Sequence, residues 1–137
     1  MVKTVILGVI SIAVMFIAAP VRDQSQQNKT EGGCQSCRHN PNINGKRFTV
    51  HGTMKMYDGA PTVRIRRTDT HRMLGVSEGR FAVDGICNLP RWLEKKLDWD
   101  REISGEFVVY PFTEDKPGAM RMVCVDTASH LTVRRLK

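Results

Sequence analysis

The four cysteines are the residues of this chain whose chemistry is easiest to specify: Cys34, Cys37, Cys87 and Cys124. An even number of cysteines is typical of disulfides in chains that leave the cytosol. Three pairings are possible, and the sequence does not choose among them. The pairing Cys34–Cys37 with Cys87–Cys124 requires the least ordering of the polar segment that contains Cys34 and Cys37. A Cys87–Cys124 bridge would close a loop of roughly 37 residues and contribute about 3–4 kcal/mol.

The spacing Cys34-Gln-Ser-Cys37 has other interpretations, and each lacks a companion signal. A thioredoxin-like redox site needs this motif at the start of a helix in a βαβ unit, and here it lies in a stretch rich in Gly and Asn. Covalent haem attachment needs His directly after the second cysteine, where Arg38 stands. A zinc site needs four ligands in paired spacing, and the other two cysteines are isolated. We therefore predict structural disulfides, with thiol-redox chemistry at Cys34 and Cys37 as the alternative.

A set of cations on two predicted strands is the best candidate for a binding surface. Arg64, Arg66 and Arg67 belong to one strand, Arg72 begins the next, and Tyr57 precedes the turn before them. Such a face would attract an anionic glycan, a lipid headgroup or an acidic protein surface. Nucleic-acid binders interleave cations with exposed aromatic side chains, and Tyr57 alone is available, so nucleic acid is disfavoured. The alternative is a solvated face that keeps the protein soluble.

The other titratable residues form no recognisable catalytic or metal-binding motif. The four histidines are scattered, and no zinc-protease, serine-hydrolase, P-loop or dinucleotide motif is present. We predict a non-enzymatic protein without cofactor or metal. An enzyme would need a site assembled in space, such as His51 beside Asp58 or Asp69. One acidic cluster could hold a hard cation but lacks the glycine of a calcium loop: Asp98, Asp100 and Glu102.

The elements that position these residues are predicted to be mainly β-strands. Apolar and polar residues alternate with the period of a strand, and the expected strands are 46–57, 63–66, 72–76 with a resumption at 80–83, 103–110, 120–126 and 131–135. Gly52, in the middle of the first strand, predicts a bulge or a sharp bend. Asn88 is expected to cap a short helix over 89–97, in which four large apolar residues share one face.

The order strand, strand, strand, helix, strand, strand resembles the OB-fold, a five-stranded, partly open barrel. We therefore expect a mainly β protein, a small OB-like barrel of five to six strands with one short helix between strands three and four. A small β-sandwich is the alternative.

The first 21 residues differ from the rest. After Lys3, an 18-residue run from Thr4 to Val21 carries no charge, which suits either a signal peptide or a membrane anchor. A cut after Ala19 would place Ile17 at the −3 position, so the cleavage site is poor. The charge of Lys3 predicts that the bulk of the chain is translocated. An apolar helix is expected here, and 4–21 would contact a membrane if it is not cleaved.

Length and composition leave room for one globular domain, since the chain has 137 residues, 41% hydrophobic and 26% charged. We assign 1–21 to the signal peptide or anchor, 22–45 to a flexible linker unless its cysteines fix it, and 46–137 to the β-barrel domain. Residues 46–80 carry eight basic and three acidic side chains, whereas 84–115 carry four basic and eight acidic. The predicted location is periplasmic or extracellular.

The segment FTVHGTMKMYDGAPTVRI (48–65) resembles a group of small secreted bacterial proteins of unknown function. Their shared pattern is an F-x-V-x-G strand, a Y-[ND]-G-x-P turn and an R-[IL] strand. Segments 70–76, 105–107 and 117–125 look similar too. The resemblance implies an exported domain and attaches no activity to it.

Overall fold

The computed structural model describes residues 33–137. The predicted apolar helix and signal or anchor segment, 1–21, and the first part of the predicted linker lie outside the described residues. No helix in the part from 33 onward combines the length and the apolarity that crossing a membrane requires.

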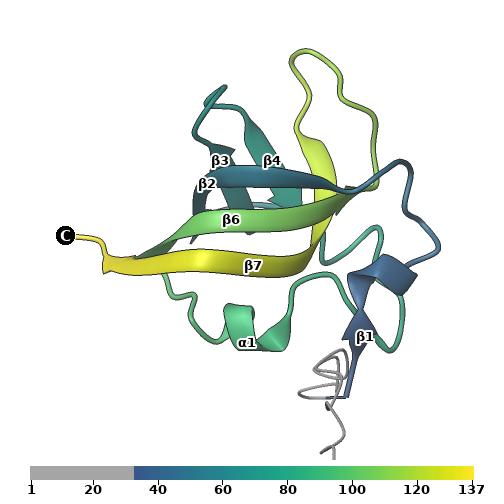
Figure 1. The fold of residues 1–137 in the computed structure, drawn as a ribbon, viewed down its shortest axis with the longest axis horizontal. Coiled ribbons are helices and arrows are strands. Elements are labelled where there is room, and N and C mark those ends of the chain that lie inside the picture. Colours follow the sequence, from purple (N-terminus) through teal and green to yellow (C-terminus); the bar gives the residue numbers. More distant parts are fainter. Residues whose placement is uncertain (1–32) are drawn as a thin grey trace, which may run out of the picture.

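Five strands form one closed sheet, in which β4 and β7 are parallel and all other neighbours are antiparallel (Figure 1). The protein is thus mainly β, as predicted. Along the sheet the order is β2-β3-β4-β7-β6, and β6 pairs again with β2. The strands are β2 (Phe48–Met56), β3 (Val63–Arg67), β4 (Met73–Val76), β6 (Arg101–Pro111) and β7 (Arg121–Arg135).

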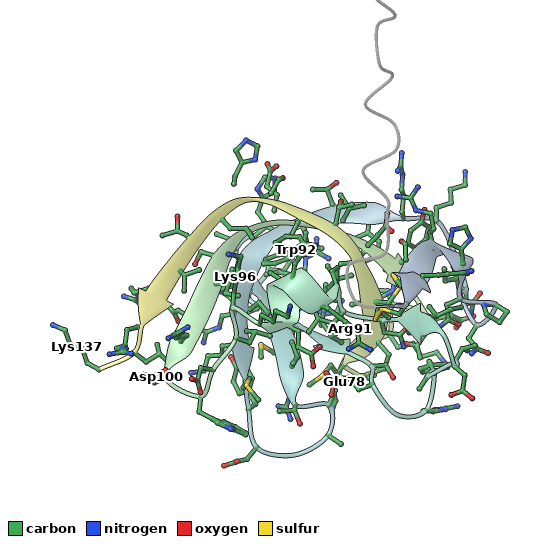
Figure 2. The ribbon with its side chains drawn as sticks, turned by 90° about the horizontal axis from the view of Figure 1, so that it is seen from below. Glu78, Arg91, Trp92, Lys96, Asp100 and Lys137 are labelled. Carbon is green, nitrogen blue, oxygen red and sulfur yellow. A yellow bond between two sulfur atoms is a disulfide. The ribbon has the colours of Figure 1, made fainter. Side chains whose placement is uncertain are left out.

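Four short elements lie outside this closed sheet. Strand β1 (Gln35–Ser36) pairs in parallel with β5 (Ile86–Cys87), and a 3-10 helix, η2 (Cys37–His39), follows β1 directly. Helix α1 (Arg91–Glu94) lies between the third and fourth strands of the closed sheet, which confirms its predicted place in the order. Seen from its own side, α1 lies across the mouth of the closed sheet (Figure 2).

The interior of the closed sheet is filled by the inward residues of every strand. Phe107, Met54 and Ile65 are among the largest fully buried side chains. Leu89 and Leu93, from the α1 segment, join the same cluster and close its end. Each fully buried aliphatic or aromatic side chain contributes about 1.5–3 kcal/mol relative to leaving it in water. The apolar and polar residues alternate along each strand because every second side chain packs into this single core.

Gly52 serves a close approach of two backbones, and of the predicted alternatives, a bulge or a sharp bend, the bulge is absent at this position. The pairing of β2 with both β3 and β6 runs through Gly52 without a shift in register. A Cβ at this position would lie 2.4 Å from the carbonyl oxygen of Arg66, so no side chain fits. The register shifts lie in the β6–β7 pairing instead, between Ser104 and Glu106 and between Val108 and Val109.

The helix is shorter than predicted, and Asn88 does not cap it. Pro90 occupies the N-cap position and makes no side-chain cap bond. The buried Asn88 side chain instead donates to the carbonyls of Ser77 (2.8 Å) and Phe81 (3.2 Å). It also accepts a hydrogen bond from Asn40 Nδ2 at 2.9 Å. Because a buried amide needs partners for all its polar atoms, Asn88 joins loops here rather than starting a helix.

Three predicted strand segments also differ. The predicted strands 120–126 and 131–135 are parts of one strand, β7, which begins at Arg121, because the polar stretch between them stays paired with β6 across the register shifts. Residues 80–83 form no strand. Phe81 in that segment stacks on Phe112 with ring centroids 4.7 Å apart. The Phe81 carbonyl accepts hydrogen bonds from the side-chain amides of Asn40 and Asn88. These side-chain contacts take the place of the backbone hydrogen bonds that a strand would make.

Candidate functional site

Two neighbouring strands place four of the outward side chains together. On β3, Val63 and Ile65 face the core, so the alternating residues Arg64 and Arg66 face outward. Lys55 of β2 lies directly opposite Arg64 in the antiparallel register. Tyr57 follows β2. We call Lys55, Tyr57, Arg64 and Arg66 the cationic surface.

Tyr57 holds two of these cations close together. The ammonium of Lys55 and the guanidinium of Arg64 each lie 5.1 Å from the centroid of the Tyr57 ring, within the range of cation–π attraction. Arg64 also donates through Nε to the carbonyl of Pro61 (2.9 Å) and through Nη2 to that of Asp58 (3.2 Å). Since carbonyl partners are neutral, these bonds fix the guanidinium without cancelling its charge.

The cationic surface is uncompensated in the sense that its three cations form no ion pair with the described part of the chain, although Glu102 of β6 is the register partner of Lys55 on the other side of β2. Within residues 33–137, no carboxylate lies within ion-pairing distance of Lys55, Arg64 or Arg66. Like charges directly opposite each other on paired strands are destabilising. Lys55 lies opposite a like charge, Arg64, on one side and an opposite charge, Glu102, on the other, and none of the three cations is held by a carboxylate of the described residues.

Arg67 and Arg72, the other predicted members, are each bound to an aspartate. Arg67 donates to both carboxylate oxygens of Asp69, at 3.1 and 3.0 Å, and this contact holds the pKa of Asp69 below its usual range. Arg72 pairs with Asp115 at 2.6 Å and donates to the carbonyl of Lys116. The structure thus separates these two arginines from the uncompensated cations.

The sequence reasoning overlooked Lys55. Alternation along β2 placed it on the outward side with Tyr57, but the same pattern fits any solvated strand. Its role follows from the register that sets it opposite Arg64. Register depends on how two strands pair and cannot be read from either strand alone.

The cysteines pair as Cys34–Cys87 and Cys37–Cys124, with Cα atoms 5.5 and 6.2 Å apart. The expected pairing Cys34–Cys37 with Cys87–Cys124 is wrong. The parallel β1–β5 pairing, in which Ser36 is the partner of Cys87, brings the segment that begins at Cys34 next to β5, while η2 turns Cys37 into a buried position against β7. The bridges fix the second half of the predicted linker, and they are compatible with an oxidising location.

An ion pair joins the same segment to β7. Arg38 donates through Nε (3.2 Å) and Nη2 (2.9 Å) to the carboxylate of Asp126, which also accepts the hydroxyl of Ser36. The Asp126 side chain is 1% exposed, whereas that of Arg38 is 37% exposed. The hydrogen bond to Asp126, and then its charge, raise the pKa of Arg38. A separation of 88 residues hides this pair from sequence inspection.

The residues considered for catalysis take other partners. His51 Nδ1 lies 3.4 Å from Glu106 Oε1, and His130 Nδ1 lies 3.0 Å from Oε2 of the same carboxylate. Asp69, a proposed neighbour of His51, is bound by Arg67. Among residues 33–137, no group of three or more His, Cys, Asp or Glu side chains is arranged to hold a metal ion.

Fold and site together define a mainly β domain with a closed five-strand sheet, two disulfides and an uncompensated cationic surface. Comparison of the chain with family models, with curated proteins and with solved structures finds no match in any of the three.

Proposed function

We propose that this protein is an exported, non-enzymatic binding module of OB-like architecture, which binds an anionic partner through the cationic surface. The strand order β2-β3-β4-β7-β6, the parallel pairing of β4 with β7 and the helix before β6 support the OB-like assignment. OB-like domains commonly bind their ligands on the face of the second and third strands, which here are β3 and β4. Of the cationic surface, Arg64 and Arg66 lie on β3, whereas Lys55 and Tyr57 lie on or directly after the neighbouring β2.

Three observations support export. Thr4–Val21 is an uncharged apolar run, the cysteines form disulfides, and segment 48–65 resembles small secreted bacterial proteins. Disulfides persist in the periplasm and outside cells, whereas the cytosol keeps thiols reduced. In that setting the fitting partners are anionic glycans, lipid headgroups and acidic protein surfaces.

The observation that carries the binding proposal is the pair Lys55 and Arg64. The two cations lie opposite each other over one Tyr57 ring, and neither forms an ion pair with a carboxylate of the described residues. Carbonyl bonds hold the Arg64 guanidinium in place. Little side-chain entropy would therefore be lost on binding a sulfate, phosphate or carboxylate group.

Neutralising the cationic surface should weaken polyanion binding more than removing equal charge elsewhere. We expect the triple variant Lys55→Gln, Arg64→Gln, Arg66→Gln to bind heparin, used as a generic polyanion, about tenfold more weakly at 0.1 M salt, which corresponds to about 1.4 kcal/mol. Heparin affinity chromatography with a salt gradient and calorimetric titration would measure this. The matched control replaces three exposed lysines outside the surface by Gln: Lys46, Lys95 and Lys96. An equal loss of heparin affinity in both variants would show that binding reflects general charge attraction and not the cationic surface.

A further inference from the structure

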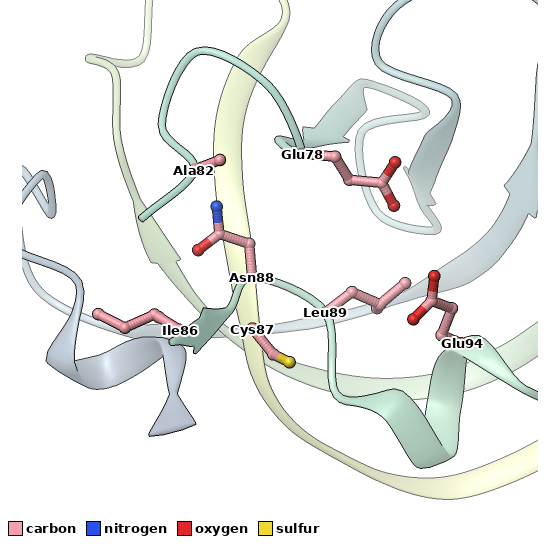
Figure 3. A pocket seen from close by; sticks show the side chains of 7 residues that line it. All are labelled: Glu78, Ala82, Ile86, Cys87, Asn88, Leu89 and Glu94. Atoms are coloured by element: carbon pink, nitrogen blue, oxygen red, sulfur yellow. The ribbon is translucent and has the colours of Figure 1, made fainter. Parts of the chain in front are cut away.

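A hollow of the opposite sign lies beside α1. Its volume is about 460 Å³, and it opens between α1, the segment after β4 and the adjoining ends of β2 and β3. We call it the acidic hollow. It is lined by Met56, Thr62, Val63, Glu78, Glu94, Leu97 and Trp99. A smaller cavity of about 190 Å³ shares Glu78 and Glu94 and extends toward Asn88 (Figure 3).

Glu78 and Glu94 face each other across this space. Glu78 follows β4 and Glu94 ends α1, and their carboxylates turn toward one another with Leu89 between them (Figure 3). In the described part of the chain, neither carboxylate has a cation within ion-pairing distance. Partial desolvation beside the hollow, and then the charge of Glu94, raise the pKa of Glu78, although both residues remain exposed to solvent. The fold therefore holds two like charges together without a counter-charge.

Apolar side chains form the rest of the acidic hollow. Met56, Val63 and Leu97 line it together with Trp99, a side chain that remains 57% exposed. An indole face attracts cations, most strongly where water is partly excluded. Carboxylates beside such a face suit a ligand that has an apolar stem and a cationic head.

We propose that the acidic hollow binds an organic cation with an aliphatic stem. The stem would lie against Met56 and Leu97, and the cationic head would contact Glu78, Glu94 and the face of Trp99. The source could be a free alkylamine or the lysine side chain of a partner, since both present the same ammonium chemistry. This site has the opposite charge to the cationic surface and a different ligand, so failure of either proposal would leave the other unaffected.

The raised pKa of Glu78 gives a folding signature that needs no ligand. The folded protein binds the Glu78 proton more tightly than the unfolded chain does, so stability falls as pH rises from the ordinary value of 4.5 through the raised pKa. Glu78→Gln should therefore raise the unfolding midpoint at pH 7 and leave it nearly unchanged at pH 4. Thermal unfolding at both pH values measures this. An equal rise at both would show that the carboxylate pair is not under electrostatic strain.

The binding test uses the full oxidised chain with two probes, 1,5-diaminopentane and Nα-acetyl-lysine amide. We expect saturable binding of at least one probe by calorimetry, together with a change in tryptophan fluorescence. The double variant Glu78→Gln, Glu94→Gln should weaken binding at least tenfold. Trp99→Phe should weaken it severalfold and abolish most of the fluorescence change, whereas Trp92→Phe should keep both. Which probe binds identifies the source as a free amine or a lysine side chain.

The matched control is the double variant Asp84→Asn, Glu114→Gln, which removes two exposed carboxylates outside the acidic hollow. It should bind the probes like the unaltered protein, and so should the triple variant of the cationic surface. Lowering the pH through the raised pKa of Glu78 should weaken binding, because the protonated carboxyl no longer attracts the cation. Absence of saturable binding of both probes, or equal weakening in the control, would overturn the proposal.

Discussion

Replacing Cys37 and Cys124 together by Ala is expected to lower the free energy of unfolding by about 4–5 kcal/mol. Cys34 lies three residues before Cys37 and Cys87 lies 37 residues before Cys124. When one bridge is intact, forming the other closes a ring that runs through both segments, a loop of roughly 40 residues. In the chain-entropy model, closing such a loop stabilises the folded state by about 4 kcal/mol. Both Cys37 and Cys124 are fully buried, so their removal also loses packing. Urea unfolding under non-reducing conditions would measure the loss.

The matched control is the double variant Cys34→Ala, Cys87→Ala. It opens an equivalent loop, but its cysteines are only partly buried and fasten two-residue strands. We expect a loss of about 3–4 kcal/mol, smaller than for the buried bridge. Peptide mapping of the unreduced protein should recover Cys34 with Cys87 and Cys37 with Cys124. A peptide with Cys34 bridged to Cys37, or a greater loss in the control, would contradict this account.

Arg38→Met should cost about 2–4 kcal/mol of unfolding free energy, because it leaves the Asp126 carboxylate buried without its cation. The partial exposure of Arg38 places the expected loss below that of a fully buried pair. Asp126→Asn in the Arg38→Met background should recover part of the loss, since the neutral amide needs no counter-charge. A double-mutant cycle by chemical denaturation measures the coupling.

A surface ion pair provides the comparison for Arg38. Arg67→Met breaks the pair with Asp69, whose side chain is 62% exposed, and should change the free energy of unfolding far less than Arg38→Met does, because solvent screens the pair. If Arg67→Met and Arg38→Met proved equally mild, Asp126 would not depend on its cation, and the segment around η2 would be held by the disulfides alone.

Local sequence patterns predicted the elements of this fold well. Alternation along 48–56 and 63–67 reflects one buried face and one exposed face of each strand, and this short-range signal survives into the structure. The helix was placed correctly in the strand order because its apolar residues close the end of the core. Its start was misplaced because Asn88, two residues before Pro90, suits a helix cap and a buried loop junction equally well.

Features that depend on distant partners could not be read from the sequence. Cys37 pairs with Cys124, 87 residues away, because η2 turns it inward, and nothing in the CxxC spacing shows that turn. In the candidate site, Arg64 and Arg66 were identified by alternation. The ion pair between Arg72 and Asp115, which lies 43 residues further along the chain, could be found only from the three-dimensional structure. The cationic surface is thus smaller than predicted and gains Lys55.

Mapping where a polyanion binds is the most direct test of the central claim. The isotopically labelled protein would be titrated with a heparin-derived hexasaccharide and followed by backbone amide shifts. We expect saturable shifts centred on residues 53–57 and 63–66, which the triple variant of the cationic surface abolishes. Shifts centred on the basic C-terminal residues 134–137, or no saturable shifts at all, would contradict the claim.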